Sequence, residues 1–183
     1  MKLLNEFVLG YPNEEVRSSL ADMYLDDVYH IEGYTTLGNE IWKSLEDENI
    51  ENLVKSFNLA ISGIPYEDFQ KDKLEESLQE YLDQRKESWY RSMFVMLLRG
   101  AGVIYFAEVH TSKGRSDVVI VFKNKVVVVE FKLAKNSSEV EKKRKEGEEQ
   151  IKSRDYSSAY KGINKKVINL VLVADDEKRK IVL

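Results

Sequence analysis

The sequence predicts a mixed α/β fold, in which a mixed central sheet follows a small, mainly helical region. The first observation is the order of expected elements from Gln84 onward, which is helix, strand, strand, strand, helix, strand. The second is the valine run Val126–Val129, which is typical of a strand buried on both faces. The third is the helical spacing of apolar residues before Asp83. We therefore expect a mainly helical, acidic region at 1–83 and an α/β domain at 84–183.

Composition excludes several kinds of protein and metal site. The 183 residues, 43% of them hydrophobic, suffice for the core of one large or two small domains. The absence of cysteine excludes disulfides and thiolate zinc sites, and two histidines are too few for a histidine-rich metal site. No apolar run approaches the roughly 20 residues of a membrane-spanning helix, and the N-terminus lacks the basic and apolar regions of a signal peptide. We therefore expect a cytoplasmic protein without a membrane partner.

The net charge of −4 is unevenly distributed along the chain. Residues 1–83 contain 6 Lys and Arg and 19 Asp and Glu, a formal charge of −13, whereas residues 84–183 contain 22 and 13, a charge of +9. A basic half is expected of a protein that binds phosphate backbones. The alternatives are that solvated faces differ by chance or that the two halves attract each other.

The region 1–83 is expected to be a small helical unit. Apolar spacing and Gly, Pro and Asn punctuation predict its elements in order: a short strand at Phe7–Leu9, a helix from Asn13 to about His30, a loop at Gly33–Gly38, and helices at Asn39–Glu46 and Ile50–Ser62. The aromatic and leucine stripes on such helices are more often core than ligand site.

A long helix is expected next, over about Asp72–Leu98, either continuous or broken near Asp83. Its second half is apolar on most sides, which favours burial against the sheet. Glu87 stands at the polar beginning of that half. It is either a surface partner of Arg91, four residues further along, or a carboxylate that faces a site.

The sheet is expected to contain five strands. The second and third form a hairpin that turns at Lys123–Lys125, where Asn124 suits a tight turn because Asn tolerates positive φ. The other strands are expected at Val103–Thr111, Val167–Val173 and Lys180–Leu183.

Charged residues cluster at the end of this hairpin. Side chains alternate along a strand, so Glu130 and Lys132 should share one face and Phe131 the other, and pairing in the hairpin brings Asp117 level with Glu130. Two carboxylates side by side suit Mg²⁺ or Mn²⁺. A neighbouring lysine can orient or deprotonate a water, or stabilise charge on a phosphate. The alternative is an ordinary hairpin in which Asp117 caps a turn and Glu130 pairs with Lys132.

Basic residues occur in the turn before the hairpin and in the helix after it. Lys113 and Arg115 lie in that turn, where they can meet phosphate. Ser137 and Ser138 are expected N-caps of a helix over about Glu139–Tyr160. This helix carries a basic cluster of Lys142, Lys143, Arg144 and Lys145. A solvated helix face is the alternative for most of this charged stretch.

The element order and these residues resemble the PD-(D/E)XK nuclease superfamily, whose members share an αβββαβ core. Asp117 aligns with the acidic residue of its second strand, Glu130-Phe131-Lys132 with the Glu-x-Lys of its third strand, and Glu87 with the glutamate of its first helix. Gln150 and Tyr156 fit a Gln and a Tyr of the following helix. The resemblance therefore implies a restriction-endonuclease-like core with a mixed central sheet.

The resemblance extends to a branch in which this domain is the C-terminal part of AAA-ATPase-like proteins. Its further motifs are matched by Tyr11-Pro12-Asn13-Glu14-Glu15-Val16, Ile64-Pro65-Tyr66, Tyr90 with Ser92, and Gly114-Arg115-Ser116-Asp117. In two departures, Ser116 stands where a proline is often found, and Arg91 where the branch often has histidine. No Gly-x-x-x-x-Gly-Lys-Ser/Thr phosphate loop is present, so this chain is not itself the ATPase.

The resemblance implies a metal-dependent nuclease that hydrolyses phosphodiester bonds, with DNA as the expected substrate. The implied catalytic residues are Glu87, Asp117, Glu130, Lys132, Gln150 and Tyr156. The implied ligands of a Mg²⁺ or Mn²⁺ ion are Glu87, Asp117, Glu130 and the carbonyl of Phe131. Nucleic acid is expected to contact Lys113, Arg115, Lys142, Lys143, Arg144 and Lys145. An ATPase domain or subunit and a second copy of the chain are further expected partners.

Two other functions stay open at this point. One is a catalytically silent module that holds nucleic acid without cutting it. The other is a protein-interaction module of an ATPase-linked system, contacted through the acidic helical half. The complete set of Asp117, Glu130 and Lys132 favours the nuclease, because a decayed site usually loses a ligand or the lysine.

Overall fold

A computed structural model describes residues 34–63, 76–111, 114–154 and 165–183. Several predictions from the sequence fall outside these residues: the strand at Phe7–Leu9, the helix from Asn13 to about His30, the Ile64-Pro65-Tyr66 motif, Lys113 and Tyr156. No helix among the described residues is long and apolar enough to cross a membrane.

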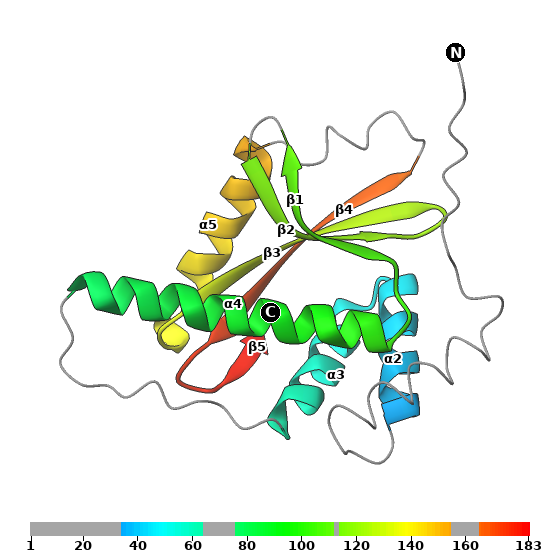
Figure 1. Cartoon of the computed structure of the whole chain (residues 1–183), viewed down its shortest axis with the longest axis horizontal. Coiled ribbons are helices and arrows are strands. Elements are labelled where there is room, and N and C mark those ends of the chain that lie inside the picture. Colours follow the sequence, from blue (N-terminus) through cyan, green and yellow to red (C-terminus); the bar gives the residue numbers. More distant parts are fainter. Residues whose placement is uncertain (1–33, 64–75, 112–113, 155–164) are drawn as a thin grey trace.

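The described elements follow the predicted order of helices, strands, helix and strands (Figure 1). They are α2 (Tyr34–Glu46), α3 (Ile50–Ser62), α4 (Glu76–Gly100), β1 (Tyr105–Thr111), β2 (Gly114–Val121), β3 (Lys125–Ala134), the 3-10 helix η1 (Ser137–Glu139), α5 (Val140–Ser153), β4 (Lys166–Asp175) and β5 (Lys180–Val182).

The five strands form one mixed sheet in the order β1-β2-β3-β4-β5. The pairs β1–β2, β2–β3 and β4–β5 are antiparallel, whereas β3 and β4 are parallel and joined through α5. This arrangement confirms the predicted mixed sheet and is consistent with a restriction-endonuclease-like core.

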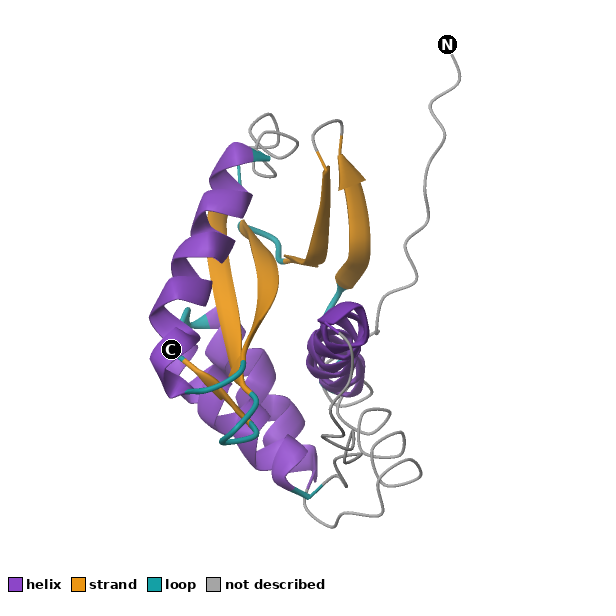
Figure 2. Ribbon diagram, turned by 90° about the vertical axis from the view of Figure 1, so that its left-hand side faces the viewer, coloured by secondary structure: helices purple, strands orange, loops and turns teal. Residues whose placement is uncertain are grey.

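Different helices cover the two faces of the sheet (Figure 2). On one face, Tyr90 and Phe94 of α4 belong to the same cluster as Phe131 of β3. On the other face, Ile151 of α5 packs with Val126 and Val128. All residues of Val126–Val129 are at most 2% exposed, so this strand is buried on both faces, as predicted.

Helices α2 and α3 pack into the same core as α4. Leu45, Leu53 and Phe57 belong to the cluster that contains Phe94. The side chain of Asn58 on α3 accepts a hydrogen bond from the Ile181 N–H at 2.7 Å and donates one to the Ile181 carbonyl at 2.9 Å, which ties α3 to β5. The division of the chain at residue 83 stays a prediction.

The helix boundaries agree with the sequence in two places and differ in two, of which one is the end of α5 at Ser153 rather than at about Tyr160. Helix α3 covers Ile50–Ser62 as predicted, and α4 runs unbroken through Asp83. The predicted loop at Gly33–Gly38 was wrong, because α2 begins at Tyr34. Gly38 therefore lies within α2, beside α4, where a Cβ added to it would make an ordinary contact of 3.5 Å with the Cα of Ala101.

The hairpin turn lies where it was predicted, but its backbone conformation differs from the predicted one. Phe122 donates its N–H to the carbonyl of Lys125, which leaves Lys123 and Asn124 as the two turn residues. The positive φ expected for Asn124 was wrong, because among the described non-glycine residues only Glu48, Glu108 and Arg179 have positive φ. The Asn124 carbonyl instead accepts a hydrogen bond from the N–H of Lys166, a tertiary contact that fixes the turn.

The predicted caps before α5 were also wrong. Asn136 caps η1, since its side chain accepts a hydrogen bond from the Ser138 N–H at 3.0 Å. Ser137 donates its hydroxyl to Asp175 at 2.6 Å, so it joins η1 to β4.

Gly147 provides a test of how closely α5 approaches the sheet. A Cβ added there would lie 2.6 Å from Cγ1 of Val171 and 3.4 Å from Cγ of Lys132. We expect Gly147→Ala to lower the free energy of unfolding by about 1–3 kcal/mol through overpacking, despite the higher helix propensity of alanine. Denaturant unfolding followed by circular dichroism measures the change.

The matched control is Gly38→Ala, in which the new methyl group meets only ordinary contacts. We expect this change to raise the free energy of unfolding by about 0.5–1 kcal/mol. If both substitutions stabilise the protein equally, α5 does not lie as close to β4 as described.

Candidate active site

The pairing of β2 with β3 ends beside the predicted catalytic residues. The last pair of this ladder is Val118↔Val129, so Asp117 and Glu130 stand level with each other just beyond it, as predicted. Strand β3 continues to Ala134, paired with β4 along its other edge. The edge of β3 that faced β2 therefore has N–H groups that need other acceptors.

Two carboxylates accept hydrogen bonds from these N–H groups. The Phe131 N–H donates to Oδ2 of Asp117 at 2.8 Å, and the Leu133 N–H donates to Oε2 of Glu87 at 3.0 Å. Residues two apart in a strand direct their N–H groups to the same edge, which explains why both bonds form on one side of β3. Glu87 of α4 thus lies against the same edge as Asp117, rather than on the surface.

Glu130 is almost completely buried at the centre of this group, with 2% of its surface exposed. Its Oε1 accepts hydrogen bonds from Nζ of Lys132, at 3.0 Å, and from Nε2 of Gln150 on α5. Its Oε2 is buried without a hydrogen-bond partner among the described residues. A buried, unpartnered carboxylate oxygen is costly, so it is the atom of this site best suited to receive a cation.

The environment raises the pKa of Glu130, which is buried, and of Glu87, which is partly buried. Burial, together with the negative charge of Asp117, raises the pKa of Glu130 to about 7, although the Lys132 ammonium group opposes the shift. Burial also raises the pKa of Glu87, again against the attraction of Lys132. The three carboxylates therefore repel one another in a partly desolvated position, which a bound cation would relieve.

The sequence analysis did not predict the ion pairs that Arg91 forms with Asp117 and Glu108. Its Nη1 lies 2.9 Å from Oδ1 of Asp117, and its Nη2 lies 3.3 Å from Oε1 of Glu108 on β1. The sequence analysis assigned Arg91 no part in the site, although its spacing of four from Glu87 places both residues on one face of α4. Its partner Asp117 lies on another element, so only the tertiary fold could show the pair.

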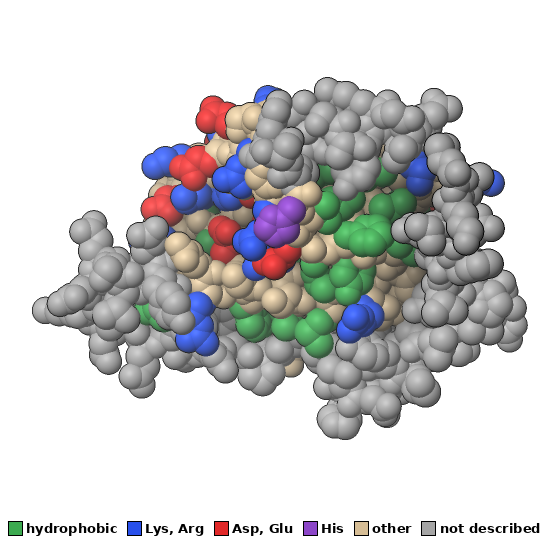
Figure 3. Space-filling view, turned by 45° about the horizontal axis from the view of Figure 1, so that its top comes forward, with side chains coloured by type: hydrophobic (Ala, Val, Ile, Leu, Met, Phe, Trp, Pro, Cys, Tyr) green, Lys and Arg blue, Asp and Glu red, His purple; other side chains and the backbone are tan. Residues whose placement is uncertain are grey.

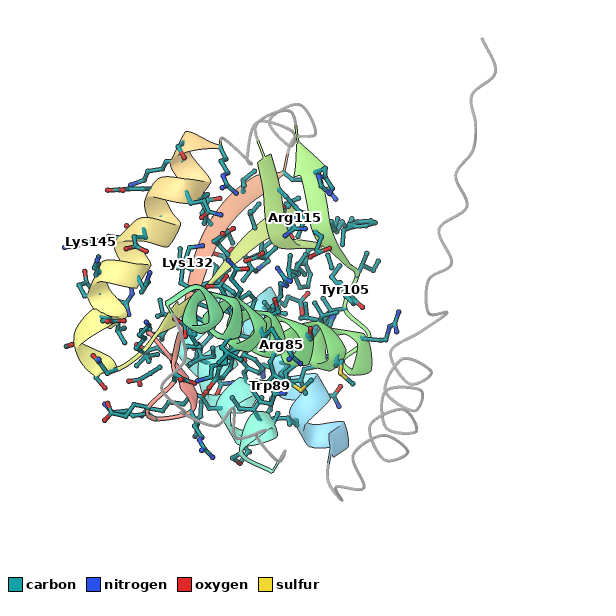
Figure 4. The ribbon with its side chains drawn as sticks, turned by 60° about the vertical axis from the view of Figure 1, so that its left-hand side comes forward. Arg85, Trp89, Tyr105, Arg115, Lys132 and Lys145 are labelled. Carbon is teal, nitrogen blue, oxygen red and sulfur yellow. The ribbon has the colours of Figure 1, made fainter. Side chains whose placement is uncertain are left out.

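The described basic residues that are predicted to contact nucleic acid lie on two elements, β2 and α5. Figure 4 shows Lys132 on β3 and Arg115 on the neighbouring β2, whereas Lys145 points outward from α5. The basic cluster forms ion pairs within its own helix: Lys142 and Lys143 with Glu146 at 4.0 and 2.8 Å, and Arg144 and Lys145 with Glu141 at 3.7 Å each. These pairs are typical of a solvated helix face, so a contact with nucleic acid stays a prediction.

The described Asp, Glu and His side chains form no group of three that is arranged to hold a metal ion. Two of the carboxylates already form ion pairs with cationic side chains: Asp117 pairs with Arg91, and Glu130 pairs with Lys132. One donor nevertheless suits a hard divalent ion, because Oε2 of Glu130 is a carboxylate oxygen without a hydrogen-bond partner among the described residues. The Phe131 carbonyl is directed to the same edge of β3 as the N–H that binds Asp117.

A family model described as the PD-(D/E)XK nuclease superfamily matches residues 85–183. This chain belongs to the PD-(D/E)XK nuclease superfamily. The match confirms the resemblance on which the sequence analysis relied, and it contains Glu87, Asp117, Glu130 and Lys132. Members of this superfamily typically use divalent metal ions, and the family implies nucleic acid as a partner. No curated protein matches the chain.

The raised pKa of Glu130 predicts how stability depends on pH when metal is removed with EDTA. The folded protein holds this proton more tightly than the unfolded chain does, so the free energy of unfolding should fall as pH rises from about 4.5 to about 7. The loss attributable to Glu130 is up to about 3 kcal/mol. Glu130→Gln should flatten this dependence, which urea unfolding at several pH values measures.

The control for this experiment is Glu177→Gln, which changes the same charge at an exposed position in the turn between β4 and β5. We expect it to keep the pH dependence of the unsubstituted protein. Equal slopes for the unsubstituted protein and Glu130→Gln would contradict the raised pKa.

Proposed function

We propose that this chain is a Mg²⁺- or Mn²⁺-dependent nuclease that hydrolyses phosphodiester bonds, with DNA as its substrate. The observation that carries the proposal is the convergence of Asp117, Glu130 and Lys132 where β2 and β3 separate. Glu87 of α4 accepts a hydrogen bond from the Leu133 N–H of β3, and Gln150 of α5 donates one to the Glu130 carboxylate. Membership of the nuclease superfamily supports this reading.

Four groups would hold the metal ion: Asp117, Oε2 of Glu130, the Phe131 carbonyl, and Glu87 either directly or through water. Asp117 and Glu87 are positioned for this by the N–H groups of β3, and Gln150 and Lys132 occupy Oε1 of Glu130. A bound divalent ion supplies a water of lowered pKa and neutralises charge on the scissile phosphate.

Lys132 would act on the attacking water. Its side chain is 14% exposed, and its ammonium group lies 3.0 Å from Glu130, so its position is fixed within the site. From there it would orient the water and stabilise charge on the phosphate. Arg115, with the basic residues of α5, would supply attraction to the nucleic-acid backbone that does not depend on sequence.

A catalytically silent nucleic-acid-binding module is the second candidate, because one observation favours it. The guanidinium group of Arg91 lies 2.9 Å from Oδ1 of Asp117, where it competes with a metal ion for that oxygen. The buried, unpartnered Oε2 of Glu130 favours the nuclease, since a site that binds no cation has no use for it. An ATPase partner remains part of the proposal, carried by the resemblance alone, and the cytoplasmic location remains the expectation drawn from the sequence.

Cleavage assays with two site variants test the nuclease. Labelled DNA and RNA, single- and double-stranded, are incubated with protein in Mg²⁺, Mn²⁺ or EDTA. We expect metal-dependent cleavage that Asp117→Asn and Lys132→Met each lower by about 10²-fold or more, since Asp117 would hold the metal ion and Lys132 would orient the water and stabilise charge on the phosphate. Gel electrophoresis of the products measures the rates.

The matched control is Lys125→Met. Lys125 lies in the same strand as Lys132 and is buried, at 3% exposed, but it donates to the Glu46 carbonyl, remote from the site. This variant should retain activity in proportion to its folded fraction. Cleavage that all variants share would reveal a contaminating nuclease. Nucleic-acid binding without cleavage in any metal would favour the silent module.

A further inference from the structure

Glu108 of β1 has a backbone conformation that residues with a side chain rarely adopt. Its φ is +53°, within a strand whose neighbouring residues pair regularly with β2. The pairs Ala107↔Val118 and Val109↔Ser116 lie on either side, so Glu108 stands level with Asp117 at an interruption of the ladder. Strained residues of this kind occur preferentially at functional sites, which directs attention to this position.

The strand turns over at Glu108. Tyr105 packs against the core cluster on the α4 face, whereas Val109 packs against the cluster on the α5 face, although regular alternation would place both on one face. As a result, the carboxylate of Glu108 stands 47% exposed at the rim of the candidate active site. Charged side chains of both signs gather on the face of the molecule shown in Figure 3.

Two guanidinium groups converge on one oxygen of this carboxylate. Nη2 of Arg91 lies 3.3 Å from Oε1 of Glu108, and Nη1 of Arg115 lies 3.4 Å from the same atom. Arg91 also holds Oδ1 of Asp117 at 2.9 Å with its other terminal nitrogen. Arg91 therefore spans the distance between a proposed metal ligand and the carboxylate of Glu108.

We propose that Arg91 and Arg115 form a clamp for one backbone phosphate of the nucleic acid, and that Glu108 occupies this clamp when nucleic acid is absent. The inference rests on the proposed function in taking nucleic acid as the ligand. It gives Arg91 a role in the site, and it makes Glu108 a competitor of the substrate.

The physical argument is that a phosphate oxygen accepts the same guanidinium donors as a carboxylate oxygen. The side chains of Glu108 and Arg115 are each nearly half exposed, at 47% and 46%. Their ion pair therefore contributes little stability, and a phosphate easily displaces Glu108 from it. Arg91 is more enclosed, at 19% exposed, and its bond to Asp117 fixes its direction. A phosphate in the clamp would therefore lie beside the carboxylates that hold the metal.

Fluorescence anisotropy with a labelled 20-base-pair DNA duplex in EDTA tests the clamp without any cleavage. We expect Glu108→Gln to tighten binding about three- to tenfold, because it removes the competing carboxylate. Arg115→Ala should weaken binding and lower the slope of log affinity against log salt by about 1, as expected for one lost phosphate contact. Glu108→Gly, which also relieves the positive φ, should tighten binding as Glu108→Gln does.

Two controls separate direct competition from a general effect of charge. Glu177→Gln makes the same charge change in the turn between β4 and β5 and should leave the affinity within about twofold. In the Arg115→Ala background, Glu108→Gln should produce a smaller gain, since Glu108 then competes with the phosphate for Arg91 alone.

Several outcomes would overturn the clamp. They are equal tightening by Glu108→Gln and Glu177→Gln, unchanged or weaker binding by Glu108→Gln, or no binding of DNA or RNA by the unsubstituted protein at low salt. Cleavage in Mg²⁺ is measured in parallel, so the two proposals can fail separately. Cleavage with no gain from Glu108→Gln removes the clamp alone, whereas a gain without any cleavage removes the nuclease alone.

Discussion

The hydrogen bonds from the free edge of β3 to Asp117 and Glu87 are the interactions on which the candidate site depends. Where β2 leaves β3, two backbone N–H groups lose their partners in the sheet, and two carboxylates replace them. The bond to Glu87 requires α4 to lie at a fixed distance from β3. The contact of Phe94 with Phe131, whose ring centroids are 5.5 Å apart, sets that distance on the apolar face. The hydrophobic core and the polar site are therefore positioned by the same pair of elements.

Burial of several charges in one place is then the main electrostatic feature of the site. Glu130 remains 2% exposed although only one of its oxygens is hydrogen-bonded, and its pKa is raised to about 7. Lys132 and Arg91 compensate part of the negative charge. A divalent ion would compensate the rest, which links the unfavourable burial to the proposed chemistry.

Much of the architecture was predictable from local pattern. The valine run at Val126–Val129 and the alternation of Glu130, Phe131 and Lys132 were sufficient to place the central hairpin and its charged end, because strand periodicity depends on local geometry. The family match over residues 85–183 confirms the resemblance to the nuclease superfamily. The roles of individual residues in catalysis stay predictions, and Tyr156 and Lys113 lie outside the described residues.

What the sequence did not reveal depends on contacts between distant elements. The positive φ of Glu108 and the Arg91–Asp117 pair exist because β1, β2 and α4 meet at one point, which no local pattern encodes. The turn at Asn124 and the caps at Ser137 and Ser138 were assigned from residue preference. Tertiary hydrogen bonds join Asn124 to Lys166 and Ser137 to Asp175, and Ser138 bonds locally to Asn136.

The central claim is that Glu130 binds a divalent ion through an oxygen that is protonated at mildly acidic pH in the metal-free protein. Isothermal titration of Mn²⁺ at pH 6 and at pH 8.5, each in two buffers of different ionisation enthalpy, measures it most directly. With a pKa of about 7 for Glu130, the account predicts release of about one proton per bound ion at pH 6 and close to none at pH 8.5. Binding without proton release at pH 6, or no binding at either pH, would contradict it.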